Sequence, residues 1–370
     1  PVKILATFSG LFGNFLSFII PLIIVGFIVP GIASLGSKSG KGLLITTIVA
    51  YLSTLLAGFA AYLIGAGILP KLISGSIALS EEGQTIEPYF TIEIPAIMGV
   101  MSALTLAFIL GIGLSKIKNS AMLKVVDEFN KIVLMIVTNV LIPLVPIYIG
   151  CVFAKLSYSG EIFNTLKSFG IVYILLFSLQ LAYILIQYCI AGAIKKENPF
   201  KLIKNMIPAY MTAVGTQSSA ATIPVTLECV KKNNISEEVL DFVVPLGATI
   251  HLAGDTITLV LTSMAVMYMN GQTPTFGMIM PFIFMLGVTM IAAPGVPGGG
   301  VMAALGLLES MLGFGAVEKP IMIALHAAQD SFGTATNVTG DGAIAIIVDY
   351  IINKRKSNSA QNESNESIIA

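Results

Sequence analysis

Charged side chains are scarce in this sequence. Asp, Glu, Lys and Arg make up 11% of its 370 residues, and their formal charges cancel to zero at pH 7. A typical soluble domain carries about 25% charged residues, so the composition excludes an ordinary soluble protein. The sequence also lacks a basic tract of the kind that nucleic-acid binding requires. We therefore expect no nucleic-acid partner.

Cysteine and histidine are also rare. Cys151, Cys189 and Cys229 lie far apart in apolar surroundings, which predicts small hydrophobic residues rather than disulfides or metal ligands. The only histidines are His251 and His326. Imidazole can titrate near neutral pH, so a proton-coupled role is one interpretation, but we favour hydrogen-bonded histidines at helix interfaces. No cofactor is predicted.

Long apolar stretches fill the sequence instead. Hydrophobic residues make up 55% of the chain, and the mean hydropathy is +0.90. Residues 168–194 and 256–308 contain no charged side chain. Because about 20 apolar residues cross the hydrocarbon core of a bilayer, we predict an all-α polytopic membrane protein. We place it in the lipid of a cell membrane of the bacterial inner-membrane type.

The loops of the first half orient the predicted spans. The loops after the first, third and fifth apolar runs are basic, whereas the loop after the second is acidic. By the positive-inside rule, the basic loops are cytoplasmic. The apolar runs lie at about 11–35, 43–69, 94–114, 132–153 and 169–193.

Two segments of the second half are expected to form re-entrant helical hairpins. Residues 200–230 have a polar centre and basic flanks, so both ends lie on the cytoplasmic side. Residues 277–312 contain APGVPGGG, which interrupts a helix. Such backbone is tolerated in a membrane where it is buried in protein or lines a cavity. Hairpins that open to opposite sides predict the inverted repeats of secondary transporters.

The last apolar helix, at about 327–350, has a polar stripe. Spacings of 4, 3 and 4 residues place Asp330, Thr334, Asn337 and Asp341 on one face. A carboxylate in the lipid interior costs roughly 2.5–3.5 kcal/mol on insertion scales. The stripe therefore predicts a binding site for ions or for a polar solute.

Four stretches resemble the dicarboxylate/amino acid:cation symporter family, which includes the glutamate transporters and the bacterial sodium/serine-threonine symporters. They are QSSAATIPVT, VPLGATIHLAGD, GVPGGG and NVTGD, in the family's order and spacing. The resemblance implies a glutamate-transporter-like fold and a homotrimer whose transport domains move as elevators against a fixed scaffold. It begins at the family's second span, and the chain begins at Pro1 rather than Met, so a further preceding span is left open.

The resemblance also implies a division of the chain. Residues 1–352 would form a single membrane-embedded unit, and the polar tail at 353–370 is expected to be disordered. The scaffold would comprise about 11–35, 119–156 and parts of 94–118, and the transport domain about 43–69, 168–194 and 199–352.

A substrate site follows from the same resemblance. Asp330 would hold the amino group of an amino acid, with Thr334 one turn further on. Backbone N–H groups at Ser218 and Ser219, near a helix N-terminus, would attract its carboxylate. The other implied substrate residues are Gly333, Asn337, Val296, Gly298 and Asp255.

Sodium is the implied coupling ion. The resemblance places one ion at Gly247, His251, Asn337 and Asp341, a second at Thr249 with the backbone of the second hairpin, and a possible third at Tyr51 and Thr54.

The chain departs from the family at the motif HLAGD. Ala253 stands where the family has an aspartate, and Asp255 where it has a threonine. Asp255 could bind a cationic or hydroxyl-bearing substrate side chain, titrate as a coupling group, or compensate another buried polar group. The ion stoichiometry, and whether a proton replaces a sodium ion, stay open.

Two positions favour a neutral substrate. Glutamate and aspartate carriers of the family have an arginine in the first hairpin or the last span, and the matching residues here are Gln217 and Gly333. An acidic side chain would lack its bidentate partner. We therefore predict symport of a small neutral amino acid, such as serine, threonine or alanine. The alternative is a symporter of dicarboxylates or of glutamate and aspartate.

We do not predict an enzyme. Asp255 and Asp341 could form the pair of an intramembrane aspartyl protease, but the sequence lacks the YD and GxGD signatures. That hypothesis also leaves the two hairpins unexplained. A channel is a further alternative, although no pore-lining repeat is visible.

Overall fold

The computed structural model describes residues 2–37, 41–73, 87–117, 120–158 and 162–369. The described residues form helices and no strand, which confirms the prediction of an all-α protein. Six of the helical segments are long and apolar enough to cross a membrane. Four of the five apolar runs of the first half correspond to such segments, whereas the run at about 94–114 corresponds to a shorter apolar helix, Val100–Lys116.

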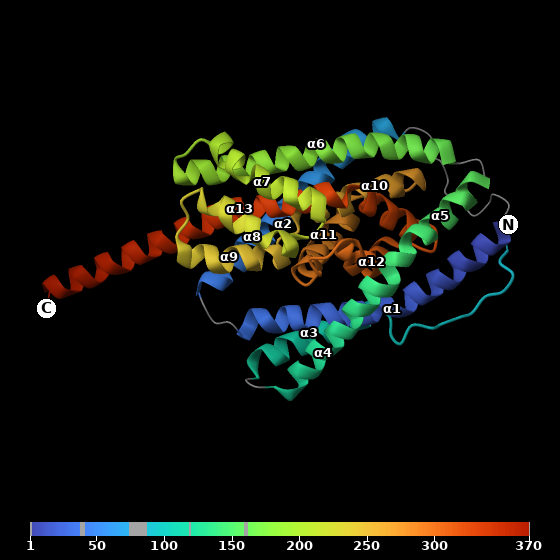
Figure 1. Ribbon diagram of the computed structural model, residues 1–370, viewed down its shortest axis with the longest axis horizontal. Coiled ribbons are helices and arrows are strands. Elements are labelled where there is room, and N and C mark those ends of the chain that lie inside the picture. Colours follow the sequence, from blue (N-terminus) through green and yellow to red (C-terminus); the bar gives the residue numbers. More distant parts are fainter. Residues whose placement is uncertain (1, 38–40, 74–86, 118–119, 159–161, 370) are drawn as a thin grey trace.

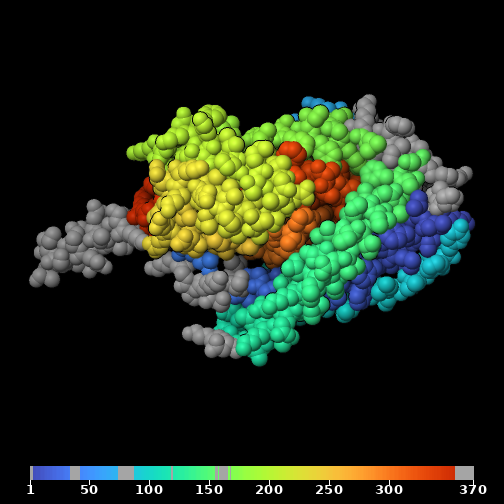
Figure 2. All heavy atoms as spheres, viewed as in Figure 1, coloured from blue at the N-terminus to red at the C-terminus, as the bar shows by residue number. Residues whose placement is uncertain are grey.

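The first half of the chain consists of long helices. α4 continues through one π-helical turn, η1, directly into α5. In Figure 1, α1, α3 and α4 lie along one side of the molecule and α6 along the opposite side. Figure 2 shows α5 crossing this face diagonally between the surface formed by residues 199–250 and α1. The bounds are Val2–Ser37 for α1, Lys41–Leu72 for α2, Val100–Lys116 for α3, Ala121–Ile136 for α4, Val137–Leu141 for η1, Ile142–Tyr158 for α5 and Ile162–Lys195 for α6.

Both expected hairpins are present as helix pairs. The first joins α7 (Pro199–Thr216) to α8 (Ser219–Lys231). Its turn consists of Gln217, with a left-handed φ of 52°, and Ser218, whose hydroxyl accepts a hydrogen bond from the N–H of Ala221. This is a common N-cap arrangement. The turn therefore ends one helix and starts the next within two residues.

The second hairpin joins α11 (Phe276–Ile291) to α12 (Gly299–Leu312). α12 begins after Gly298, whose φ of 72° is readily adopted by glycine. Between the hairpins, α9 (Glu237–Ile250) and α10 (Ala253–Met269) are separated by two non-helical residues. The order of hairpin, broken helix and hairpin is the one expected from the sequence.

The last helix, α13, runs from Glu318 to Ile369. The structure thus differs from the expected disordered tail at 353–370, because the backbone stays helical through residue 369. Residues 351–369 contain neither glycine nor proline, so the sequence has no residue that would stop the helix.

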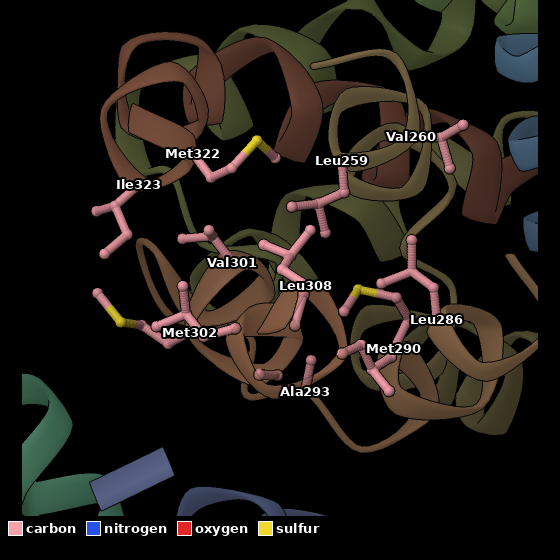
Figure 3. Packing of buried hydrophobic residues seen from close by; sticks show 14 of the residues in the cluster. Leu259, Val260, Leu286, Met290, Ala293, Val301, Met302, Leu308, Met322 and Ile323 are labelled. Atoms are coloured by element: carbon pink, nitrogen blue, oxygen red, sulfur yellow. The ribbon is translucent and has the colours of Figure 1, made fainter. Parts of the chain in front are cut away.

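Two apolar clusters meet along α13. In the first, Leu259 of α10 packs with Met290 of α11 and Leu308 of α12, as Figure 3 shows. The second packs α7, α8 and α9 against residues such as Ile344 of α13. Met322 of α13 belongs to the first cluster. The polar stripe of α13 therefore lies between two tightly packed regions.

Candidate functional site

The break between α9 and α10 lies against the polar stripe of α13. Gly254 follows the break, and a Cβ atom there would lie 2.3 Å from the carbonyl oxygen of Gly333. The N–H of Gly254 donates a 2.7 Å hydrogen bond to Oδ1 of Asn337. Glycine at this position lets α10 begin this close to α13.

The tips of the two hairpins meet at the same level. The hydroxyl of Ser218 donates a 2.7 Å hydrogen bond to the carbonyl oxygen of Gly295. Below the tips lies a cavity of about 10 Å³, with room for about one water molecule. Its lining contains two carboxylates but neither lysine nor arginine. The lining residues are Gln217, Ser219, Ala248, Leu252, Asp255, Pro294, Gly295, Val296, Gly300, Asp330, Thr334 and Asn337.

Asp330 connects α13 to the second hairpin. Its Oδ2 accepts a 2.7 Å hydrogen bond from the N–H of Gly298, at the start of α12. Its Oδ1 lies 3.4 Å from the hydroxyl of Thr334, one turn along α13. Backbone N–H groups at a helix N-terminus stabilise negative charge. The structure therefore brings Asp330, Thr334 and Gly298 together, as the sequence predicted.

Asp255 lies beside Asp330 and is also buried. Its Oδ1 is 2.7 Å from Nε2 of His326, and its Oδ2 accepts a hydrogen bond from the side-chain amide of Asn337. Ligand atoms of Asp255, His326 and Asp330 all lie within 4.8 Å of one another. At an effective dielectric constant of about 20, two negative charges at that distance repel by roughly 3.5 kcal/mol. Positive charge near this pair is therefore strongly favoured.

A second aspartate–histidine pair lies further along α13. Nδ1 of His251 is 3.0 Å from Oδ1 of Asp341, and both side chains are buried. Nε2 of His251 is 3.0 Å from the hydroxyl of Ser53 and 3.4 Å from the amide of Gln187. A Cβ atom on Gly247 would lie 2.7 Å from Asp341 Oδ1. Gly247, His251 and Asp341 therefore lie close together, and their role as ion ligands stays a prediction.

The side chain of Asn337, one turn before Asp341 on α13, faces the start of α10. Its side chain binds Gly254 and Asp255 at the start of α10. It thus links the break to the substrate residues. A pair of aspartates sharing a proton would suit a protease, but Asp255 and Asp341 are bound to different histidines.

Three expected ion ligands do not join these clusters. The hydroxyl of Thr249 is exposed and donates to the carbonyl oxygen of Leu246. Thr54 donates to the carbonyl oxygen of Ala50 in its own helix, whereas the hydroxyl of Tyr51 bonds the carbonyl oxygen of Phe284. The possible third site stays a prediction, because a hydroxyl that donates to a carbonyl oxygen still has lone pairs on its own oxygen.

The residues expected to face the substrate side chain carry no positive charge. Gln217 donates from its amide to the hydroxyl of Ser331 at 2.9 Å. A Cβ atom on Gly333 would lie 3.2 Å from the amide end of Gln329. That amide end in turn accepts a 2.9 Å hydrogen bond from Gln180. A neutral network of amides and hydroxyls therefore occupies this side of the site.

Sequence reasoning missed Ser53, Gln187 and Gln180. Ser53 and Gln187 contact His251, and Gln180 binds Gln329 and the hydroxyl of Thr258. The sequence did contain a signal for these residues, because each is a polar residue within an apolar run. Ser53 lies in the run at 43–69, and Gln180 and Gln187 lie in the run at 168–194. Their partners lie on distant helices, so their roles could not be assigned from spacing.

Comparison with known proteins identifies relatives of this chain. Excitatory amino acid transporter 1 of Ambystoma tigrinum is 32% identical over 178 residues, which is 48% of this chain and 32% of the relative. The human protein of the same name is 32% identical over 159 residues, or 43% and 29% of the two chains. An excitatory amino acid transporter of Caenorhabditis elegans is 25% identical over 290 residues, or 76% and 57%. The chain thus spans less than two thirds of each of these relatives.

The match to a known family extends over nearly the whole chain. Residues 2–351 match the sequence profile described as the sodium:dicarboxylate symporter family. The match includes the two hairpins, the break between α9 and α10, and the polar part of α13. This multi-pass membrane protein belongs to the sodium:dicarboxylate symporter family.

Proposed function

We propose that the protein is a secondary symporter that couples inward cation flux to uptake of a small neutral amino acid. Serine, threonine and alanine are the preferred substrates. The observation that carries the proposal is the cavity between the hairpin tips. Its lining contains Asp330 and Asp255 but neither lysine nor arginine.

A buried carboxylate suits the substrate's amino group. Asp330 is 5% exposed, and its hydrogen-bond partners among the described residues are the neutral groups of Gly298 and Thr334. A cation held by such a carboxylate reduces the desolvation cost of both charges. An α-ammonium group supplies that cation. The substrate's carboxylate would then bind N–H groups at the start of α8, where Ser219 lines the cavity.

The lining also bears on the substrate's side chain. An acidic side chain would introduce a negative charge next to two carboxylates, with no guanidinium in the lining to pair with it. Serine or threonine would add only a hydroxyl, which Gln217 or Asn337 can match. The lining therefore supports a neutral substrate.

The competing hypothesis is uptake of acidic amino acids. Its support is that the relatives described above are named excitatory amino acid transporters. Under that hypothesis, a cation from outside the described lining must balance the substrate's second carboxylate.

Coupling and assembly complete the proposal. We assign one sodium ion to Gly247, His251, Asn337 and Asp341, and a second to Thr249 with the backbone of the second hairpin. Cation binding would favour closure of that hairpin, after which the transport domain moves as an elevator within a homotrimer. The division into scaffold and transport domain follows the ranges given by the family resemblance.

Uptake in proteoliposomes tests the proposal. Labelled serine uptake is measured with an inward sodium gradient, with an inward proton gradient alone and with no gradient. Unlabelled amino acids and C4 dicarboxylates are then added as competitors. We expect gradient-dependent uptake that threonine and alanine inhibit. Efficient inhibition by glutamate or aspartate would favour the acidic alternative, and gradient-independent flux would contradict symport.

A further inference from the structure

Two buried glutamines, Gln180 of α6 and Gln329 of α13, form a pair of hydrogen-bonded side-chain amides, called the amide pair below. Gln180 is 2% exposed and Gln329 is 0% exposed. The amide of Gln180 donates a 2.9 Å hydrogen bond to Oε1 of Gln329 and a 3.2 Å hydrogen bond to the hydroxyl of Thr258 in α10. The amide pair therefore joins three helices that surround the candidate site.

Each member of the amide pair keeps one polar atom without a partner. Among the described residues, Oε1 of Gln180 and Nε2 of Gln329 make no hydrogen bond. An unpaired polar atom in the interior is costly, so it indicates a missing partner such as a ligand or a water molecule. Rotating both amides by 180° would exchange their N and O atoms but would still leave one donor and one acceptor.

A hydroxyl group has the complementary chemistry. It has one O–H donor and two acceptor lone pairs, so a single hydroxyl can donate to Oε1 of Gln180 and accept from Nε2 of Gln329. An ionised carboxylate has no donor, an ammonium group has no acceptor, and a methyl group has neither. The amide pair therefore suits a neutral hydroxyl rather than a charged or an apolar group.

The amide pair lies next to the lining of the cavity between the hairpin tips. Gln329 directly precedes Asp330 in the chain, and a Cβ atom on Gly333 would lie 3.2 Å from the Gln329 amide. A Cβ atom on Gly254 would in turn lie 2.3 Å from the carbonyl oxygen of Gly333. Gly254 also binds Asn337, which lines the cavity. Two glycines, which contribute no side chains, thus connect the amide pair to the lining.

The amides that line the cavity itself already have partners. Gln217 donates a 2.9 Å hydrogen bond to the hydroxyl of Ser331. Asn337 accepts a hydrogen bond from the N–H of Gly254 and donates one to Asp255. A hydroxyl that binds one of these amides must share it with an existing partner. The amide pair, in contrast, has a donor and an acceptor that no described residue uses.

We propose that the amide pair is a specificity-determining subsite for the side-chain hydroxyl of serine or threonine. This deepens the proposed function and rests on it, because the substrate's ammonium group is held at Asp330. A substrate hydroxyl satisfies both unpaired amide atoms, whereas alanine leaves them without a partner. The amide pair therefore favours serine over alanine. A water molecule offers the same chemistry, so the experiment must separate the two sources of the hydroxyl.

Equilibrium binding of labelled serine and of labelled alanine to the purified protein tests the proposal. Serine should bind the unmodified protein about 2- to 12-fold more tightly than alanine, the range expected for one net hydrogen bond. Gln180→Met and Gln329→Met keep the approximate length of the side chain but remove its amide. Each should bring the serine-to-alanine affinity ratio close to one, through a loss of serine binding alone. Equal affinities of the unmodified protein for serine and alanine would overturn the proposal.

Tyr173→Phe is the matched control. Tyr173 of α6 donates a 3.1 Å hydrogen bond to the carbonyl oxygen of Leu325 in α13, so this variant loses a contact between the same two helices. Its serine-to-alanine ratio should be unchanged. If the amide pair were merely structural, its methionine variants would lose affinity for serine and alanine equally. If it bound only water, they would keep the ratio of the unmodified protein. Either result would overturn the proposal.

Thermal unfolding in detergent verifies that each variant is folded before its affinities are compared. If the methionine variants did not fold, Gln329→Asn would decide, because it keeps the amide but withdraws it by one carbon. Its ratio should also fall, and an unchanged ratio would contradict the proposal. Equal binding of serine and alanine refutes the subsite but leaves the proposed function in place. Absence of binding of both amino acids contradicts the proposed function, and the subsite with it.

Discussion

The N–H of Gly298 donates a 2.7 Å hydrogen bond to Oδ2 of Asp330. This contact connects the tip of the second hairpin to the carboxylate that we assign to the substrate's amino group. Under the proposed function, opening the tip would break a hydrogen bond to the carboxylate that holds the amine, which would couple the position of the hairpin to the occupancy of Asp330.

Gly298→Ala should weaken the closed position of the second hairpin. Gly298 has a φ of 72°, and a Cβ atom there meets open space, so the effect is one of backbone strain. A non-glycine residue in the left-handed region costs roughly 1–2 kcal/mol, which shifts the closed-to-open ratio by about 5- to 30-fold. Labelling of a cysteine placed at the tip should become faster.

The matched control for that strain is Gly277→Ala in α11. A Cβ atom on Gly277 also meets open space, but its φ is not in the left-handed region. Labelling at the tip should be unchanged in this variant. Equal labelling in both variants would show that strain at Gly298 does not control the hairpin.

Asp330→Asn should weaken amino-acid binding by roughly 10- to 100-fold. A hydrogen bond to a charged group contributes about 1.5–3 kcal/mol, and about 1.4 kcal/mol corresponds to a factor of ten. Equilibrium binding of labelled serine provides the measurement. Thr334→Val, which removes a hydroxyl 3.4 Å from the carboxylate, should have a smaller effect. A larger loss in Thr334→Val than in Asp330→Asn would contradict the assignment.

Gly333→Arg should move the preference toward acidic substrates. A side chain from Gly333 first meets the amide end of Gln329, 3.2 Å from the Cβ position, so a larger side chain requires that group to shift. A guanidinium binds a carboxylate through two hydrogen bonds. Inhibition of uptake by aspartate should strengthen at least about tenfold, while Gly333→Ala should leave the preference unchanged.

Gly254→Ala should destabilise the site without changing any charge. Its Cβ atom would lie 2.3 Å from the carbonyl oxygen of Gly333, and backbone atoms cannot move away cheaply. Overpacking of this kind costs about 1–3 kcal/mol, visible as a lower temperature of thermal unfolding. Gly113→Ala in α3, where nothing lies within 4 Å of the Cβ position, is the control. Equal unfolding temperatures for the two variants would refute the close approach of α10 to α13.

Asp341→Asn should lower the affinity for sodium by about tenfold or more, because an amide oxygen carries no net charge for the ion. The apparent sodium constant for serine uptake is the measurement. Asp349→Asn should leave it unchanged, since Asp349 lies against Ser236 instead. An unaltered sodium dependence in Asp341→Asn would remove Asp341 from the proposed ion site.

Much of the architecture followed from the sequence because local rules decide it. Apolar length predicts a span, and APGVPGGG ends a helix wherever it occurs. The 353–370 tail shows the weakness of composition alone, since a polar segment without glycine or proline continues α13 to Ile369. A polar composition indicates that a segment is soluble. It does not end a helix, because ending one requires a stop signal such as glycine or proline.

The candidate site was only partly predictable. Helical spacing correctly placed Asp330, Thr334, Asn337 and Asp341 on one face of α13. Spacing along α13 could not identify the hydrogen-bond partners of these residues, because those partners lie on other helices or on other turns of α13. Tyr51 and Thr54 are expected at an ion site, and the structure shows their hydroxyls donating to the carbonyl oxygens of Phe284 and Ala50.

The sequence by itself determined a multi-pass helical protein with two interrupted segments and a polar stripe on its last helix. These features depend on residues close together along the chain. Only the tertiary structure decided that His251 binds Asp341, 90 positions away, and that His326 binds Asp255, 71 positions away. Such pairs depend on how the helices pack, because the two residues of each pair are too far apart along the chain for local spacing to bring them together.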